Sequence, residues 1–181
     1  GNDISHAQGV KLINKTPDGF HEEVQINTTD KTGFDEAIAL AKKVEVVIMV
    51  LGEHGFQSGE GRSRSKLDLP GFQQELLEEV AAVNPNIVLV LMNGRPLILN
   101  WAAENIPAIV EAWQLGTQSG NAIAQVLYGD YNPSGKLPMS FPRSVGQLPL
   151  YYNHKSTGRP GTEGVDPGSV FWSHYGDEKN S

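Results

Sequence analysis

The stretch VVIMVLGEHGFQSGEGRSRS, residues 46–65, decides the fold of this chain. Its first six residues are an uninterrupted apolar run, which predicts a strand buried on both faces, as in a parallel sheet. The loop after this strand places Glu60 between Gly59 and Gly61. Open parallel sheets bind ligands at the carboxyl ends of their strands, and the flanking glycines leave the Glu60 side chain exposed. Glu60 is therefore the leading candidate for a functional residue.

Regular elements are predicted on both sides of this loop. Residues 34–41 carry apolar side chains at helical spacing, with Asp30 or Thr32 in place to cap the helix. Residues 70–83 repeat that spacing, and residues 87–92 form a second apolar run that predicts another buried strand. The chain therefore alternates between helix and strand on either side of residues 46–65.

The alternation continues toward the C-terminus. The sequence predicts a short helix, a third strand, a third helix and a last strand at residues 97–103, 107–113, 119–128 and 136–141. Repeated strand–helix–strand units are typical of right-handed parallel crossovers, so we expect a layered α/β sandwich with a mostly parallel sheet. Because the strands of such a sheet end at one edge, four side chains should share one rim: Glu60, Arg64, Arg95 and Trp113.

The segments outside these units differ in composition. Residues 1–32 are polar, and their apolar residues 24–26 predict at most an edge strand. Residues 142–181 are rich in proline, glycine and aromatic residues and predict no further α/β unit. We therefore expect an incomplete N-terminal part at 1–32, an α/β sandwich core at 33–141 and a wrapping tail at 142–181.

Composition limits the possible partners and cofactors. The chain has 14 Lys and Arg against 21 Asp and Glu, a formal charge of -7, which argues against binding of nucleic acids or anionic membranes. It has no cysteine, and its five histidines show no ligand spacing, so we expect no metal or other cofactor. No apolar run approaches the ~20 residues that span a bilayer.

A series of motifs resembles one known family. In chain order these motifs are Val50-Leu51-Gly52-Glu53, Gly59-Glu60-Gly61-Arg62-Ser63-Arg64, Leu67-Asp68-Leu69-Pro70-Gly71-Phe72-Gln73, Asn93-Gly94-Arg95-Pro96, Glu111-Ala112-Trp113 and residues 127–138. Together they resemble the C-terminal domain of the glycoside hydrolases of family 3, in particular the bacterial periplasmic β-glucosidases. The resemblance extends from about residue 46 to residue 174 and is thin before residue 46.

The resemblance implies a mechanism shared between two domains. In such enzymes a (β/α)8 barrel supplies an aspartate nucleophile, and an α/β sandwich supplies the acid/base glutamate. When the motifs are matched residue by residue, Glu60 occupies the position of this glutamate. No residue of this chain matches the nucleophile. Because retaining hydrolysis needs two carboxyl groups about 5–5.5 Å apart, the chain alone should be inactive. The resemblance also implies that a strand and a helix are absent before Gly33, and that the tail wraps the interface with the barrel.

The implied enzyme is a retaining, exo-acting β-glucosidase that removes terminal β-D-glucosyl residues from β-linked glucosides or oligosaccharides. It is expected to be periplasmic or secreted, with the N-terminal barrel of the same polypeptide as its partner. Two alternatives stay open. One is a β-xylosidase or another exo-glycosidase, because the barrel grips most of the sugar ring. The other is a non-catalytic α/β module that binds a sugar or phosphate ligand.

Each candidate residue also has a plainer interpretation. On spacing alone, Glu60 is an ordinary exposed loop carboxylate. Glu53 either pairs with Glu60 as a second carboxylate or, as the preferred interpretation, anchors the long loop at the strand end. Arg64 either sets the charge of the site or forms a salt bridge with Asp68. Arg95 holds its turn through its several donors or, as the lesser alternative, contacts sugar hydroxyls.

The remaining two candidates are aromatic. Trp113 either offers a face for stacking on a sugar or packs in the core, as is common for a tryptophan at a strand end. His54 is interpreted as a hydrogen-bonding residue of the loop rather than as a catalyst.

Overall fold

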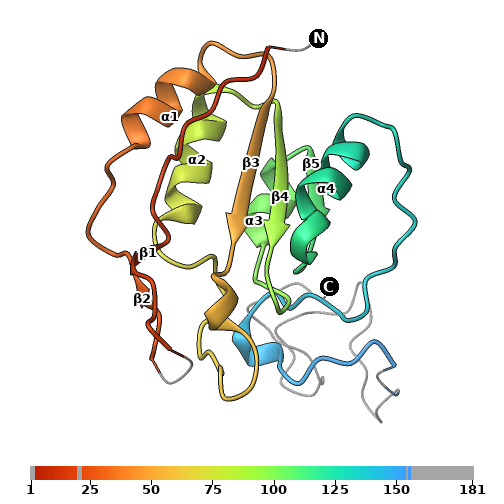
Figure 1. Cartoon of the computed structure of the whole chain (residues 1–181). Coiled ribbons are helices and arrows are strands. Elements are labelled where there is room, and N and C mark those ends of the chain that lie inside the picture. The colour runs from red at the N-terminus through yellow and green to blue at the C-terminus, as the bar shows by residue number, and fades with distance from the viewer. Residues whose placement is uncertain (1–2, 20–21, 154, 156–181) are drawn as a thin grey trace, which may run out of the picture.

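A parallel sheet in the order β3-β4-β5 lies at the centre of the molecule (Figure 1), in a computed structural model that describes residues 3–19, 22–153 and 155. Its strands are β3 (Val47–Gly52), β4 (Ile87–Met92) and β5 (Ala108–Glu111). A separate antiparallel pair is formed by β1 (Ile13–Lys15) and β2 (Gln25–Ile26). The parallel strands and their crossover helices confirm the predicted layered α/β fold.

The helices are α1 (Phe34–Ala41), α2 (Gln73–Val83), α3 (Asn100–Asn105) and α4 (Ser119–Leu127). Residues of α1, α2 and α3 belong to one buried cluster on one face of the sheet, whereas α4 lies in front of β5 in Figure 1. The predicted short helix begins three residues later than expected, and the third strand is shorter than 107–113. Both differences lie at element ends, where sequence patterns define the boundaries least well.

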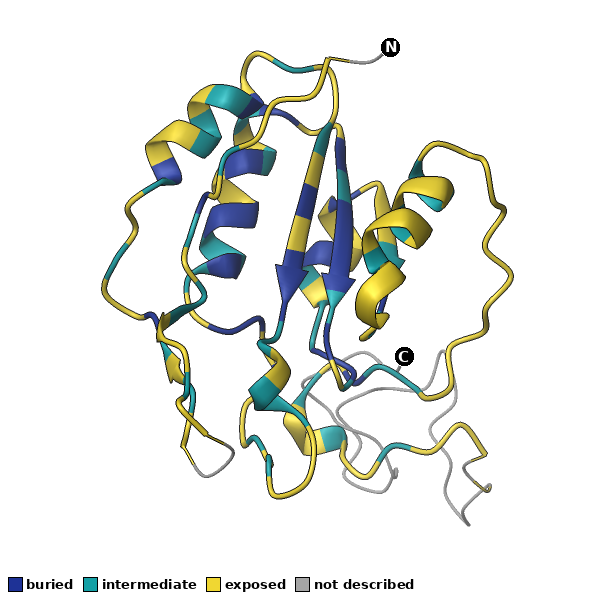
Figure 2. Ribbon diagram, in the orientation of Figure 1, coloured by how far each residue is buried: buried dark blue, intermediate teal, exposed yellow. Residues whose placement is uncertain are grey.

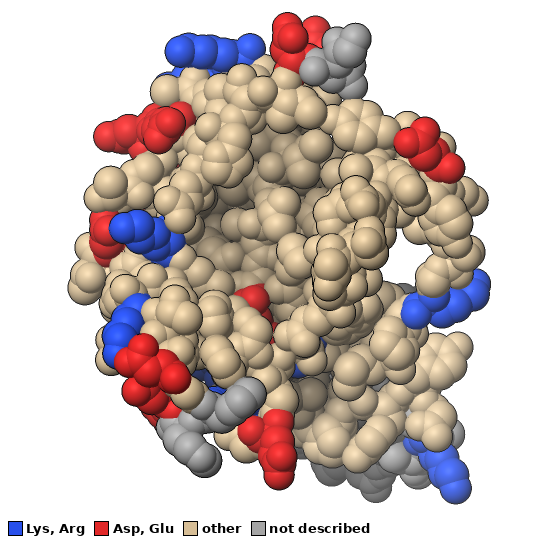
Figure 3. Space-filling view, viewed as in Figure 1, with Lys and Arg blue, Asp and Glu red and all other residues tan. Residues whose placement is uncertain are grey.

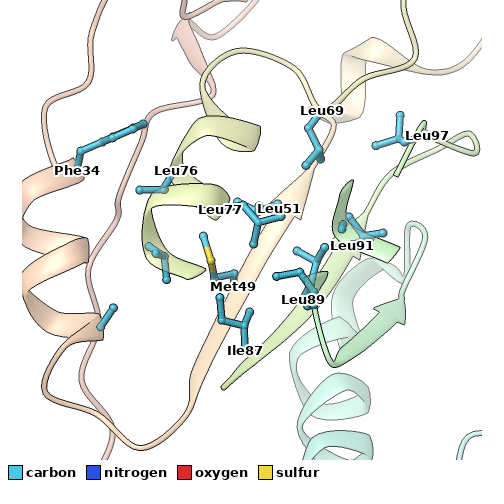
Figure 4. Packing of buried hydrophobic residues seen from close by; sticks show 14 residues of the cluster. Phe34, Met49, Leu51, Leu69, Leu76, Leu77, Ile87, Leu89, Leu91 and Leu97 are labelled. Atoms are coloured by element: carbon cyan, nitrogen blue, oxygen red, sulfur yellow. The ribbon is translucent and has the colours of Figure 1, made fainter. Parts of the chain in front are cut away.

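The hydrophobic core lies between the sheet and these three helices (Figure 4). Leu77 of α2 and the β4 residues Ile87, Leu89 and Leu91 are fully buried. Burial of each such side chain contributes about 1.5–3 kcal/mol. The core therefore fixes β3 and β4, from which the functional loops emerge.

One face of β3 is open, which corrects the expectation of burial on both faces. Val46, Ile48 and Val50 are 48%, 45% and 55% exposed, and Figure 2 shows alternating buried and exposed bands along this strand. Among the described residues, no helix packs over β3 on this side. The space-filling view shows a hollow there, lined mainly by uncharged residues (Figure 3).

Two further local expectations are wrong. Neither Asp30 nor Thr32 caps α1, whose N-cap is Gly33 with no side-chain hydrogen bond. Instead, Asp30 Oδ1 accepts a hydrogen bond from the Thr32 backbone N–H, and hydrogen bonding with Thr32 lowers the pKa of Asp30. Hydrogen bonding within the turn thus competes with capping of the helix.

The last predicted strand, residues 136–141, is absent from the structure. Leu137 and Met139 are exposed there. Pro138 has no N–H to donate to a sheet, and no strand among the described residues lies alongside to pair with this segment. The aromatic residues Phe171, Trp172 and Tyr175 of the predicted tail lie outside the described residues.

Candidate active site

Three loops meet at the carboxyl edge of the sheet, as the sequence predicts. They are residues 53–72 after β3, residues 93–99 after β4 and residues 112–118 after β5. Gln114 Nε2 donates to Ser58 Oγ at 2.9 Å, and Gly94 N–H donates to Glu53 Oε2 at 3.1 Å. These bonds join the second and third loops to the first one.

Glu60 stands at the exposed tip of the first loop. Gly59 and Gly61 on either side have φ angles of 118° and 69°, a backbone region that disfavours side chains. Among the residues that the structure describes, the Glu60 carboxylate makes no hydrogen bond or ion pair. The tip thus presents a carboxyl group that is open to a ligand or to another domain.

Glu53 lies at the foot of the same loop, and its side chain is fully buried. Its Oε1 accepts a hydrogen bond from Arg64 Nη1 at 2.7 Å and lies 3.1 Å from Arg95 Nε. The Arg95 contact is an ion pair without the alignment of a hydrogen bond. One buried carboxylate therefore holds two guanidinium groups, together with the Gly94 backbone.

The two arginines act within the protein rather than toward solvent. Arg64 Nη2 donates to the Asp68 backbone oxygen, so the predicted alternative of a salt bridge to the Asp68 side chain is wrong. Arg95 Nη2 donates to the carbonyl oxygens of Gln57 and Arg62, the latter at 2.8 Å. Arg95 therefore holds the neighbouring loop and not only its own turn.

Further contacts stabilise the first half of the loop. The His54 ring accepts a hydrogen bond from the Phe56 N–H, and Gln57 Oε1 accepts one from the His54 N–H. These two bonds form a capping box around the 3-10 turn Gly55–Gln57. The interpretation of His54 as a hydrogen-bonding residue of the loop is confirmed.

The junction between β3 and the loop is also closely packed. Buried Gln73 donates to the Gly52 carbonyl and accepts from the Gly52 N–H, each at 2.8 Å. Gly52 has φ 147°, and a Cβ at this position would lie 1.9 Å from the Met92 oxygen. Only glycine therefore fits at the start of the loop.

Trp113 has the only positive φ of a non-glycine residue in the described part of the chain, at 48°. Its backbone N–H donates to Glu111 Oε1 at 3.0 Å, and its half-buried ring lies 5.9 Å from the Phe141 ring. Left-handed non-glycine residues cost about 1–3 kcal/mol and persist only where neighbours impose them. Trp113 thus packs on Phe141 at the rim and does not belong to the buried hydrophobic cluster.

Glu111 and Asn93 form a polar pair at this edge that the sequence patterns did not predict. Asn93 is fully buried, and its Nδ2 donates to the Arg95 oxygen and lies 3.4 Å from Glu111 Oε2. Burial raises the pKa of Glu111, although hydrogen bonds from Trp113 and Asn93 oppose the shift. Both residues stand at the ends of apolar strands and within the motifs quoted above, but neither signal pairs them with each other.

Two negative observations apply to the described residues alone. They contain no group of three His, Cys, Asp or Glu side chains that could hold a metal ion. They also contain no helix with the length and apolar character needed to cross a membrane.

Comparison with known proteins identifies the class. The sequence matches the Glycosyl hydrolase family 3 C-terminal domain over residues 3–176. It is 43% identical over 186 aligned residues to the periplasmic β-glucosidase of Salmonella typhimurium, covering 99% of this chain. It is 49% identical over 127 residues to a β-xylosidase of Formosa agariphila, covering 70% of this chain. The chain spans only 24% and 18% of the lengths of these two relatives.

Solved structures agree with the sequence matches. The β-glucosidase of Listeria innocua in complex with gluconolactone matches with a TM-score of 0.77 and 39% identity, covering 85% of this chain and 21% of that one. The parallel sheet and the loops at its rim therefore define an α/β domain of a known kind. The chain belongs to glycoside hydrolase family 3 and has the fold of its C-terminal domain.

Proposed function

We propose that this chain is the C-terminal domain of a longer, retaining, exo-acting β-glucosidase, and that Glu60 is its general acid/base. The observation that carries the proposal is the contrast within one loop. The tip holds a carboxyl group without a partner among the described residues, while buried ion pairs fix the foot. A general acid/base must come within hydrogen-bond reach of the proton that it transfers, and a carboxyl group at an exposed tip is free to do so.

The proposed chemistry has two steps. Protonated Glu60 donates its proton to the glycosidic oxygen as the bond between that oxygen and the sugar breaks, and an aspartate outside this chain forms a bond to the sugar. The Glu60 carboxylate then takes a proton from the water that attacks this covalent intermediate. The attack releases the sugar and the free aspartate, and Glu60 is again protonated.

The test is Glu60→Ala in the complete enzyme, measured on aryl β-glucosides with good and poor leaving groups. Loss of a general acid lowers rates by about 10²–10⁴-fold where the leaving group needs a proton, and by much less where it does not. Added azide should then form a β-glucosyl azide. Equal activity of Glu60→Ala and the native enzyme on all substrates would refute the assignment.

A matched control is Glu75→Ala. Glu75, in the first turn of α2, pairs with Lys31 and forms none of the contacts that hold residues 53–64, so its loss should leave the rate on every substrate unchanged. A loss that followed the leaving group in this variant as well would point to a general effect of removing a carboxylate.

The sugar specificity has a second candidate. The 49% identity to a β-xylosidase favours xylosides as the alternative substrates. Rates of the complete enzyme on aryl glucosides, xylosides and galactosides would separate the possibilities, and we expect glucosides to react fastest.

The partner of the domain is, in our proposal, a barrel of the same polypeptide that carries the nucleophile. We expect residues 33–141 to form the sandwich core, and residues 142–181, of which 154 and 156–181 lie outside the described residues, to wrap the interface with the barrel. The chain alone should hydrolyse no aryl glucoside and should bind sugar weakly, as calorimetry would detect. Tight binding by the chain alone would favour a non-catalytic binding module.

By analogy with the Salmonella relative, we place the enzyme in the periplasm or outside the cell.

A further inference from the structure

We propose that Glu53 is a positioning residue for Glu60, and that it acts through Arg95 and Arg64. This inference rests on the proposed acid/base role of Glu60 and extends it to a second carboxylate in the same loop. The two residues have different tasks: Glu60 meets the substrate, whereas Glu53 remains inside the protein.

The loop has two limbs, residues 53–59 before Glu60 and residues 61–72 after it. Arg95 Nη2 donates to the carbonyl oxygen of Gln57, three residues before Glu60, and to that of Arg62, two residues after it. A single nitrogen thus links both limbs directly below the tip. The separation of the limbs, and with it the direction of the tip, depends on where this guanidinium group lies.

Glu53 determines that place. Its Oε1 contacts Arg95 Nε at 3.1 Å, and its Oε2 accepts from the N–H of Gly94, the residue before Arg95. The same Oε1 holds Arg64, which belongs to the second limb. All three contacts converge on a side chain that is fully buried, at the end of a strand that the core fixes.

Gly94 joins this network to the first limb in two ways. Its N–H donates to Glu53, and its backbone packs closely against Ser58. A Cβ at Gly94 would lie 2.1 Å from Ser58 Oγ and 2.5 Å from Ser58 Cβ. Ser58 stands two residues before Glu60, so its close approach to Gly94 sets the position of the tip. Gly94→Ala should move this limb while it leaves Glu53 and both arginines in place.

The consequence for catalysis is specific. A displacement of about 1 Å in a catalytic group can cost about 100-fold in rate. If the acid is displaced, the loss falls on substrates whose leaving groups need protonation. A fall in the amount of folded enzyme lowers the rate on every substrate by the same factor and leaves the ratio between substrates unchanged. The ratio of kcat/KM between good and poor leaving groups therefore separates positioning from folding.

The experiment measures this ratio in the complete enzyme for Glu53→Gln, Gly94→Ala, Glu60→Ala and the control Glu75→Gln. We expect Glu53→Gln and Gly94→Ala to lose about 100-fold on phenyl β-glucoside and less than about 10-fold on 2,4-dinitrophenyl β-glucoside. Glu75→Gln should lose nothing on either. In the double variant Glu53→Gln/Glu60→Ala, the ratio should match that of Glu60→Ala alone.

The outcomes separate the two proposals. If Glu60→Ala changes the ratio but neither Glu53→Gln nor Gly94→Ala does, the positioning role is overturned and the acid/base role stands. If Glu60→Ala leaves the ratio unchanged, the acid/base role itself has failed. Should Glu53→Gln not fold, the same ratio measured in Arg95→Met decides the question, because this variant removes the link from Glu53 to both limbs while Arg64 still pairs with Glu53.

Discussion

Glu53 and Glu60 stand seven positions apart in one loop, yet their surroundings are opposite. The Glu53 side chain is fully buried and contacts two guanidinium groups and a backbone N–H. Glu60 is exposed and, within the described residues, has no polar partner. A buried charge is tolerated only when it is paired, whereas an exposed one contributes little to stability. The foot of the loop, around Glu53, therefore carries its stability and leaves the tip at Glu60 available for chemistry.

Replacing a glycine by alanine should destabilise the protein far more at the foot of the loop than at its tip, and this is the largest difference that we expect. In Gly52→Ala the new Cβ would meet the Met92 oxygen, so we expect a loss of about 4 kcal/mol or more in the free energy of unfolding. In Gly61→Ala no heavy atom lies within 4 Å of the new Cβ, and the left-handed φ alone should cost about 1–2 kcal/mol. Urea unfolding followed by circular dichroism measures both. If both variants lost the same free energy of unfolding, the foot of the loop would be no more tightly packed than the tip.

Removal of Arg95 should loosen the link between the two limbs. Hydrogen bonds from charged donors contribute about 1.5–3 kcal/mol, so we expect Arg95→Met to lose about 2 kcal/mol. Amide hydrogen exchange should accelerate mainly within residues 54–64. Lys66→Met is the control, since Lys66 is an exposed cation of the same loop and, among the described residues, forms no hydrogen bond or ion pair that holds the loop. Unchanged exchange in Arg95→Met would show that the limbs do not depend on this residue.

A smaller effect is expected where the loop meets the third strand. Ser58→Ala removes the acceptor of the Gln114 side chain, a neutral bond near solvent that should contribute about 0.5–1 kcal/mol. Ser63→Ala, at an exposed position of the same loop, should change the free energy of unfolding by less than about 0.5 kcal/mol. If both variants lost the same free energy of unfolding, the hydrogen bond between Gln114 and Ser58 would contribute nothing measurable to stability.

The smallest effect concerns Glu111, a carboxyl group intermediate in burial between Glu53 and Glu60. Burial raises its pKa above 4.5, so folding favours its neutral form. Its stabilising contribution is therefore complete below pH 4.5 and is lost as pH rises through the folded pKa. The stability of the native chain relative to Glu111→Gln should decrease between about pH 4 and pH 7. Urea unfolding across this range measures the difference, and a constant difference would contradict the assigned shift.

Much of this arrangement could be predicted from the sequence. Apolar runs at residues 46–51 and 87–92 were sufficient to place two parallel strands, and the glycines beside Glu60 marked an exposed tip. The rule that parallel strands end at one edge then brought Arg95 near the same loop. Local pattern and chain topology together determine these features.

Other features depend on contacts between distant segments. The apolar run of β3 would be the same whether one or both of its faces were covered, so sequence could not show that Val50 is exposed. Glu53 and Arg95 are far apart in the chain, and no spacing rule pairs them. The predicted capping of α1 by Asp30 was wrong because the Asp30 side chain accepts a hydrogen bond from the Thr32 backbone N–H. Such outcomes depend on competition between partners that only the folded chain brings together.

The most direct test compares Glu53→Ala with Glu60→Ala in this chain by urea unfolding. Loss of one partner from a buried ion pair costs about 3–5 kcal/mol, because the guanidinium groups remain buried without their carboxylate. Glu60→Ala should change the free energy of unfolding by less than about 0.5 kcal/mol. A large loss for Glu53→Ala beside an unchanged Glu60→Ala is the predicted result. Equal losses, or a larger loss for Glu60→Ala, would contradict the division of the loop into a stabilising foot and a functional tip.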